Sequence, residues 1–272
     1  MIVISNIYGT YKHLIIGVGV VGDATGYMLE KLEQEVWYTD TDISKLKDRQ
    51  QHDGREVDSY DYIWVCTAEW NVDEVLGQFK GLTNIIVIRA TTPPGYTSSA
   101  RKIYNLPGLI HMPEFLRAKH ARHDVMNPDR IIMGCKPLMN FSLLGRRIFE
   151  LYHMLSQQIC LSTEYVTPTE SELIKLVSNA YLSTQVSFWN EIKWACRKFN
   201  VDPKAVVMGV AADKRVSSYG WRKFGKFSGF CLPKDLKSLI LAIKTKKGKC
   251  SILESVQEVN ENESEEAKPL IR

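Results

Sequence analysis

Short apolar runs and amphipathic stretches alternate along the first half of the chain. The apolar runs lie at 14–16, 36–38, 62–67, 84–89, 108–112 and 130–134, and stretches with helical spacing lie near 71–80, 96–104 and 137–156. Continuous apolar strands that alternate with helices are typical of a parallel sheet covered by helices on both faces. The pattern therefore predicts an α/β fold built on a doubly wound parallel sheet.

A long amphipathic segment follows at 167–199. It opens with Thr167, Pro168 and Glu170, the pattern of a capping box with proline at the first helical position. Apolar residues then recur with helical spacing as far as Phe199. A helix of about 32 residues would be about 48 Å long, which favours a link between two domains or a dimer interface.

A glycine motif lies between the first apolar run and the first amphipathic stretch. Gly17, Gly19 and Gly22 form G-x-G-x-x-G, and Asp40 ends the next apolar run. Glycines at these positions permit a tight turn, a close approach of backbone to a pyrophosphate and close packing of helix on strand. The following helix offers N–H donors to that pyrophosphate. The motif predicts a Rossmann-type domain in which Asp40 accepts from the adenosine ribose and favours NAD over NADP.

These patterns divide the chain into three parts. We expect a dinucleotide-binding Rossmann domain at 1–165, a long central helix with a small helical domain for catalysis and dimerisation at 166–259, and a polar tail at 260–272. A further helix is expected at 235–247.

Composition adds limits on the class of protein. Hydrophobic residues make up 44% of the chain, charged residues 24%, and the net charge is +4, which is ordinary for a globular protein and gives no reason to expect nucleic acid. The six cysteines are widely spaced without a CxxC pair, which argues against a zinc site and a secreted disulfide framework. No signal peptide or long apolar span is recognisable, so we expect a cytoplasmic protein that is not in a membrane.

One cysteine has an unusual setting. FSGFCLPKD at 227–235 places Cys231 between Gly229 and Lys234. A nearby cation favours the thiolate, and a flexible backbone lets a substrate approach. The residues alone also fit an ordinary turn before a helix, with the cysteine as a small apolar side chain.

Polar side chains at three other places suit a reaction site. Lys175 and Asn179 share one face of the long helix, where they suit stabilisation of a developing oxyanion, although a surface lysine beside an asparagine is equally common. Thr67 and Thr91 follow apolar runs, at the strand ends where ligands bind in such sheets, although an ordinary strand-end threonine explains either one alone.

Six ordered motifs together resemble those of the UDP-glucose/GDP-mannose dehydrogenase family. They are GVGVVG at 17–22, IRATTPPGYT at 88–97, MPEFLRAKHARHDVMNPDRIIMG at 112–134, SELIKLVSNAYLSTQVSFWNEI at 171–192, DKRV at 213–216 and SGFCLPKD at 228–235. The resemblance implies oxidation of the C6 alcohol of a nucleotide sugar, such as UDP-glucose, to the acid in two hydride transfers to NAD. Cys231 would be the nucleophile that carries a thiohemiacetal and then a thioester.

The resemblance also implies roles for other residues. Lys175 and Asn179 would stabilise the alkoxide-like oxygen, Glu114 would serve the water that cleaves the thioester, and Asp235 with Thr91 would hold a water for proton transfer. The residues implied in cofactor binding are Gly17, Val18, Gly19, Val20, Val21, Gly22, Asp40, Lys45, Thr67, Thr91 and Lys234. Those implied in substrate binding are Glu114, Phe115, Leu116, Arg117, Lys175, Asn179, Arg215, Tyr219 and Gly229. Arg215 would reach the substrate of the partner subunit in a homodimer.

The chain also departs from the family pattern. Met112, Ala118 and Ser228 stand where the family has asparagine, glutamate and glycine, and Tyr96 replaces a threonine. The chain stops soon after SILESVQEVNE, which resembles the helix before the family's C-terminal domain, so we expect a shortened form without that UDP-binding domain. Two alternatives stay open: a cofactor-binding but inactive paralogue or partner subunit, and a two-electron dehydrogenase of the β-hydroxyacid type.

Overall fold

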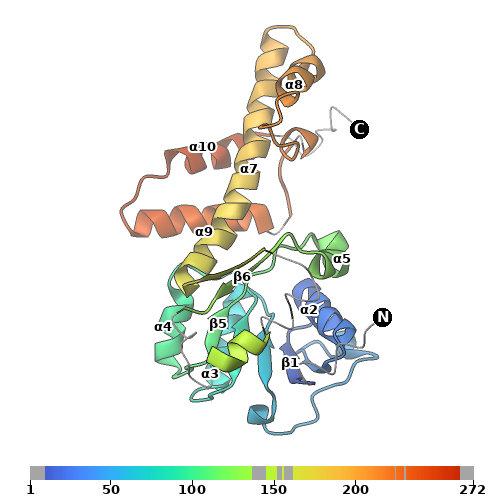
Figure 1. The fold of residues 1–272 in the computed structure, drawn as a ribbon. Helices are drawn as coiled ribbons and strands as arrows, with labels where there is room; N and C mark the ends of the chain where they lie inside the picture. The colour runs from blue at the N-terminus through green and yellow to red at the C-terminus, as the bar shows by residue number, and fades with distance from the viewer. Residues whose placement is uncertain are drawn as a thin grey trace. The chain divides into compact units, whose positions relative to one another are not determined.

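A computed structural model describes residues 10–136, 145–151, 155, 162–223, 225–229 and 231–263 (Figure 1). The chain divides into two compact units, Met1–Glu172 and Leu173–Arg272. The domain boundary expected from the sequence precedes the long helix, whereas the division in the structure falls inside its first turns.

Unit 1, Met1–Glu172, is built on a seven-stranded sheet with the order β2-β1-β3-β4-β5-β6-β7. In chain order the strands are β1 (Lys12–Ile16), β2 (Glu35–Thr39), β3 (Tyr62–Val65), β4 (Ile85–Ile88), β5 (Leu109–His111), β6 (Arg130–Gly134) and β7 (Ser162–Val166). All neighbours are parallel except β5 and β6, which are antiparallel. The α/β class with a Rossmann-type sheet is confirmed. The expectation of an all-parallel sheet is wrong at β6, because apolar runs indicate burial but not the direction of a neighbouring strand.

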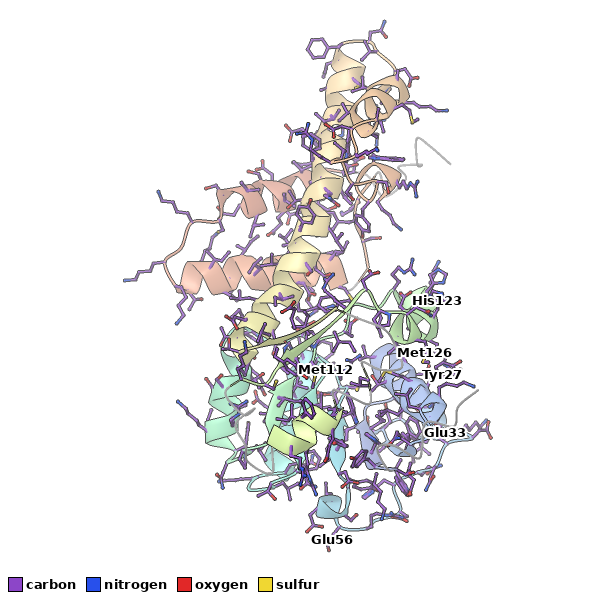
Figure 2. The ribbon with its side chains drawn as sticks, in the orientation of Figure 1. Tyr27, Glu33, Glu56, Met112, His123 and Met126 are labelled. Carbon is purple, nitrogen blue, oxygen red and sulfur yellow. The ribbon has the colours of Figure 1, made fainter. Side chains whose placement is uncertain are left out.

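Helices cover both faces of this sheet. Ile15 and Trp64 point into a core shared with α2 (Val20–Lys31) and α5 (Ala121–Met126). The residues next to them in the strands, such as Ile63, enter the opposite core with α3 (Val72–Gln78) and α4 (Tyr96–Ile103). The labelled side chains of Tyr27 on α2 and of His123 and Met126 on α5 lie along the contact of these two helices (Figure 2).

One predicted helix of unit 1 is only partly described. Within 137–156, residues 145–151 and 155 are helical, and the other positions lie outside the described residues.

Unit 2, Leu173–Arg272, contains most of α7 (Pro168–Lys198) together with α8 (Pro203–Ala211), α9 (Cys231–Thr245) and α10 (Ser251–Glu261). The predicted long helix and its capping box are confirmed: Thr167 N–H donates to Glu170 Oε2 over 2.7 Å, and Glu170 N–H donates to Thr167 Oγ1 over 3.3 Å. The apolar core of the unit joins α7, α9 and α10 through residues such as Leu176, Leu239 and Val256.

Two boundaries in unit 2 differ from the sequence-based expectation. Helix α9 begins at Cys231 rather than at 235, because Pro233 lies in its first turn, where a missing N–H costs nothing. The polar tail does not begin at 260: α10 extends to Glu261, and both Asn260 and Glu263 are only 6% exposed. Polar composition alone did not reveal that these side chains are buried with partners. Residues 264–272 lie outside the described part of the chain.

Candidate active site

The glycine motif forms the turn between β1 and α2, beside the point where the strand order reverses between β1 and β3. Gly17 has a φ of +87°, which L side chains rarely adopt. A Cβ on Gly22 would overlap the carbonyl oxygen of Gly17, so the helix packs directly on the turn. Nothing lies within 4 Å of the Cβ position of Gly19, which leaves the open space that a pyrophosphate needs.

Asp40 is tied to this turn after the end of β2. Its Oδ2 accepts from Val18 N–H over 2.6 Å, its Oδ1 accepts from Asp42 N–H over 2.8 Å, and Lys45 Nζ lies 3.4 Å from Oδ1. Burial raises the pKa of Asp40, but the two backbone hydrogen bonds and the lysine outweigh it and hold that pKa below its ordinary value. The carboxylate is therefore charged at neutral pH and oriented at the mouth of the glycine turn.

A cavity of about 450 Å³ extends from the turn along the ends of β1, β2 and β3. Its lining includes the predicted cofactor residues Gly17, Gly19, Asp40, Lys45 and Thr67. The Thr67 hydroxyl is buried and has no hydrogen-bond partner among the described residues, so a polar atom in the cavity would satisfy it. The open Gly19 position, the charged Asp40 and this hydroxyl together fit a dinucleotide.

The remaining residues predicted for the cofactor in the glycine turn have different surroundings. Val18 is buried in the sheet core, Val21 packs against that core, and Val20 is 49% exposed. Val18 and Val20 border a second hollow of about 750 Å³, whose other wall is formed by residues 118–123. Arg122 from that wall makes a two-bond ion pair with Asp23 in the first turn of α2.

Sequence reasoning missed Glu172, which fixes the loop that carries Thr91. The Glu172 side chain is fully buried, and its Oε1 accepts from both the backbone N–H and the hydroxyl of Thr97, over 2.7 and 2.6 Å. Its Oε2 accepts from Gly95 N–H over 2.5 Å. Burial raises the pKa of Glu172, although the hydrogen bonds from the loop oppose that effect. No local pattern identifies this residue, because its partners lie more than 70 positions earlier in the chain.

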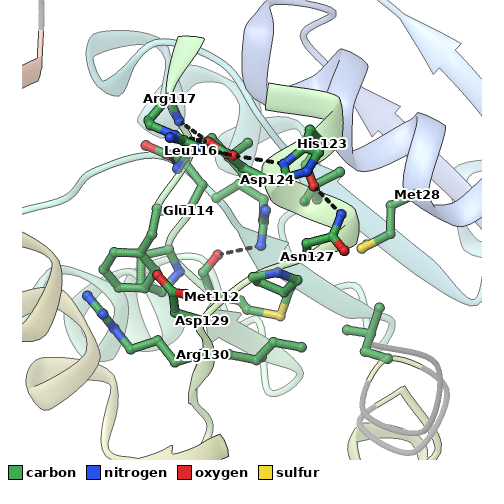
Figure 3. Close-up of a pocket in the computed structure, with 17 residues that line it drawn as sticks. Met28, Met112, Glu114, Leu116, Arg117, His123, Asp124, Asn127, Asp129 and Arg130 are labelled. Carbon is green, nitrogen blue, oxygen red and sulfur yellow. Dashed lines mark hydrogen bonds and ion pairs between the residues drawn. The ribbon is translucent and has the colours of Figure 1, made fainter. Parts of the chain in front are cut away.

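A cavity of about 470 Å³ lies next to the predicted substrate segment of unit 1 (Figure 3). The four residues predicted in this segment all contribute to its lining: Glu114, Phe115, Leu116 and Arg117. Arg117 is turned to Asp124 in a two-bond ion pair over 2.9 and 2.6 Å.

The lining of this cavity includes a charged group that sequence reasoning missed. Arg89 follows β4 and is 6% exposed; its Nη1 donates to the Met112 carbonyl over 3.2 Å, and its Nε has no hydrogen-bond partner among the described residues. An arginine at the end of the apolar run NIIVIR was the available signal.

Unit 2 brings four predicted catalytic residues together on α7 and α9. Asp235 is fully buried, and its Oδ2 accepts from Asn179 Nδ2 over 2.6 Å. Lys234 Nζ lies 2.8 Å from the other carboxylate oxygen of Asp235. Lys175 is one turn before Asn179 on α7. It is 4% exposed, so it is not an ordinary surface lysine. Cys231 is exposed in the first turn of α9, four residues before Asp235.

The other predicted residues of unit 2 take different positions. Gly229 is exposed with a φ of +89°, in the loop that leads to Cys231. Tyr219 is half-buried against the core of α7 and α9, and burial raises the pKa of its hydroxyl. Arg215 is 88% exposed and pairs with Asp213 in the loop after α8.

Comparisons with known proteins bear on both units. Residues 169–262 match the central domain of the UDP-glucose/GDP-mannose dehydrogenase family. A UDP-glucose 6-dehydrogenase of Campylobacter jejuni is 29% identical over an alignment that covers 84% of this chain and 67% of that protein. One from Streptococcus pneumoniae is 35% identical over 58% of this chain and 40% of its own length.

Solved structures agree on the fold. A UDP-glucose dehydrogenase of Pyrobaculum islandicum superposes with a TM-score of 0.81 at 21% identity, over 94% of this chain and 69% of that one. A UDP-D-ManNAc dehydrogenase of Pyrococcus horikoshii superposes with a TM-score of 0.76 at 16% identity, over 92% and 68%. The chain thus spans about two thirds or less of the relatives that it matches. The resemblance seen in the motifs is confirmed: residues 169–262 match the central domain of the UDP-glucose/GDP-mannose dehydrogenase family, and the chain as a whole is similar to about two thirds or less of the dehydrogenases named here.

Proposed function

We propose that this chain is an NAD-dependent nucleotide-sugar 6-dehydrogenase that oxidises the C6 alcohol to the acid. The observation that carries the proposal is the arrangement on α7 and α9, where an exposed Cys231 precedes by one turn a buried Asp235 bound to Asn179. The relatives named UDP-glucose 6-dehydrogenase support a UDP-sugar as the substrate.

The glycine turn and its surroundings are the residues that we assign to NAD. The N–H groups at the start of α2, around Val18 to Gly22, would bind the pyrophosphate, and Asp40 and Lys45 would lie beside the adenosine ribose. The charged Asp40 disfavours a 2′-phosphate, because two negative charges would face each other. Bound NAD supplies the hydride acceptor. We assign Thr67, Thr91 and Lys234 to the remaining contacts with the cofactor.

Cys231 makes the second oxidation possible. Its thiolate adds to C6 of the aldehyde, the new C–S bond gives a thiohemiacetal, and the carbonyl oxygen takes a proton. The aldehyde also has a hydrogen on C6, but only the thiohemiacetal has an ionisable hydroxyl beside it. Loss of that hydride to the acceptor and of the hydroxyl proton to solvent leaves a thioester. Water then breaks the C–S bond, which releases the acid and restores the thiol.

The polar residues of α7 and α9 serve the oxygen atoms in these steps. Lys175 and the Asn179 amide would donate to the C6 oxygen as it gains negative charge. Asp235 would take the proton of the alcohol through a water. We assign Glu114 to the water that cleaves the thioester, and Phe115, Leu116, Arg117, Tyr219 and Gly229 to binding of the sugar nucleotide.

We further propose a homodimer that forms through α7. Leu173, Val177, Tyr181 and Phe188 follow one another at helical spacing, and each is between 37% and 61% exposed. An apolar stripe of this kind on a helix favours a self-complementary contact around a twofold axis. Arg215, exposed beyond α8, is the residue that we assign to the partner's substrate.

Counting NADH per sugar consumed tests the proposal. Purified chain with NAD and a panel of UDP- and GDP-sugars is expected to form two NADH per sugar, with the acid as the product. One NADH per substrate would favour the two-electron alternative, and NAD binding without turnover would favour the inactive paralogue.

Two variants show whether Cys231 does the chemistry. Cys231→Ser should lower acid formation by about a hundredfold or more, because a serine ester forms and breaks poorly in place of the thioester. Cys250→Ser, at a buried cysteine remote from α9's first turn in the sequence, should retain turnover. Equal losses in both variants would contradict the assignment.

A further inference from the structure

Two buried asparagines each bind both backbone polar groups of one residue in the loop before Cys231. Asn190 on α7 is fully buried; its Oδ1 accepts from Gly225 N–H over 2.9 Å, and its Nδ2 donates to Gly225 C=O over 2.9 Å. Asn260 on α10 makes the same pair with Phe227, over 2.8 and 3.2 Å. The two amides therefore hold alternate residues of one short loop, as a neighbouring strand would.

Glycines give this loop conformational freedom that other contacts must restrict. Gly225 has a φ of +100° and Gly229 a φ of +89°, so a glycine in a conformation that other residues rarely adopt lies on each side of Phe227. Among the described residues of this loop, Phe227 contributes a large buried side chain to the core. Without the asparagines, the buried N–H and C=O groups of Gly225 and Phe227 would lose their partners, so other loop conformations would become comparable in free energy.

The helices that carry the two asparagines are themselves tied together. Ser187 on α7 donates to the Val256 carbonyl on α10 over 2.9 Å, and Lys193 on α7 pairs with Glu263 over 3.3 Å, with both partners buried. In the sequence Asn260 lies between Val256 on α10 and Glu263, which follows the end of that helix. The labels α7, α9 and α10 in Figure 1 mark the three helices involved.

We propose that Asn190 and Asn260 are positioning residues that hold Cys231 in its reactive place. The proposal rests on the proposed function, in which Cys231 is the nucleophile. After Cys231, the Asp235–Asn179 bond fixes the first turns of α9; before it, the two asparagines fix the loop. The thiol is thus held by the loop that precedes it and by the helix that follows it. Asn260, near the end of α10, contributes to holding the loop.

The test uses the full chain and three independent readouts. Asn260→Ala is expected to lower kcat by about tenfold or more with KM changed by less than about twofold, because a small displacement of a reacting group costs rate rather than binding. It is also expected to slow alkylation of Cys231 by iodoacetamide at pH 7 by about threefold, because the first turn of α9 no longer holds the thiolate. Amide hydrogen exchange at Phe227 should accelerate in the same variant.

Two matched controls separate positioning from stability. Asn262→Ala removes an exposed asparagine two residues away and should leave all three readouts unchanged. Val256→Ala removes a buried apolar group from the same helix; it should lower the melting temperature while leaving the alkylation rate and kcat within about twofold. Asn260→Asp, which keeps the acceptor for Phe227 N–H, should restore part of the protection of that amide.

The failures of the two proposals are distinguishable. Wild-type alkylation and exchange rates in Asn260→Ala would overturn the positioning role, whatever the enzymatic activity. Absence of NADH formation in the wild type would overturn the proposed function, while the alkylation and exchange rates would still decide what the asparagines do.

Discussion

At the scale of single residues, the cysteines differ most clearly in burial. Burial raises the pKa of the Cys66 thiol to about 12 and that of Cys135 to about 11, and Cys196 and Cys250 are also buried. Cys231 is exposed. We expect iodoacetamide to label Cys231 faster than these four near neutral pH, with NAD and substrate together protecting it. Mass-spectrometric labelling rates measure this, and slow labelling that ignores ligand would favour the inactive paralogue.

His13 should make the fold sensitive to acid. Its ring is fully buried against Tyr62, its Nδ1 accepts from Trp64 Nε1 over 3.0 Å, and burial lowers its pKa from 6.5 to about 3. The folded state therefore favours the neutral ring, so this contribution to stability is complete above pH 6.5. The contribution of His13 to stability declines by up to about 1.4 kcal/mol per pH unit as the pH falls toward 3.

A variant separates the effect of His13 on the pH dependence of stability from the effect of the carboxylates. His13→Gln keeps an acceptor for Trp64 but has no proton to gain, so its free energy of unfolding should fall less steeply between pH 6.5 and 4. Urea titrations of both proteins at several pH values measure the two slopes. Parallel slopes would contradict a buried neutral His13.

At the scale of elements, two glycines of one turn should separate folding from cofactor binding. Gly22→Ala places a Cβ against the Gly17 carbonyl and should lower the melting temperature. Gly19→Ala meets no protein atom within 4 Å and should leave the melting temperature nearly unchanged, yet weaken NAD binding by about tenfold or more, because the methyl group occupies the pyrophosphate's space. Calorimetric titration with NAD and thermal unfolding measure the two effects; unchanged NAD affinity in Gly19→Ala would contradict this placement.

The first two turns of α7 offer a second matched pair. Glu172→Gln sets an amide donor against an N–H of the loop and should destabilise the protein by about 1–3 kcal/mol. Glu170→Gln changes an exposed capping residue and should cost about 1 kcal/mol or less. Denaturant unfolding compares the two variants, and equal effects would show that the buried contacts of Glu172 contribute little.

At the scale of the whole molecule, we expect a dimer. Sedimentation at micromolar concentration should give twice the chain mass. Tyr181→Glu, in the exposed stripe of α7, should give the monomer, because a charge would be buried at the contact. Glu191→Lys, a charge change at another exposed position of α7, serves as the control. A monomeric wild type would contradict the dimer and the role assigned to Arg215.

Trp189 is not available for that contact. It is an aromatic residue of α7, but it is 4% exposed and packs with Val207 and Trp221 inside unit 2. Helical spacing places a residue on a face of the helix, and only the packing of α8 shows which face the unit itself covers.

Local sequence determined much of this protein. The strand-turn-helix around Gly17 to Gly22, the capping box of α7 and the pairing of Lys175 with Asn179 on one helical face all follow from interactions between residues close in the chain. Such features depend on backbone conformation, hydrophobic period and capping, which are encoded within a few residues.

Tertiary structure decided the features that join distant segments. Four features connect positions that are separated in sequence by up to 77 residues. They are the antiparallel pairing of β6, the strand β7, which no apolar run predicted, the bonds of Glu172 to Gly95, and those of Asn260 to Phe227. A glutamate or asparagine in an amphipathic helix has the same local pattern whether it faces water or a buried loop. Its role is set by which backbone groups lose their access to water when the chain folds, and that is a property of the packed chain.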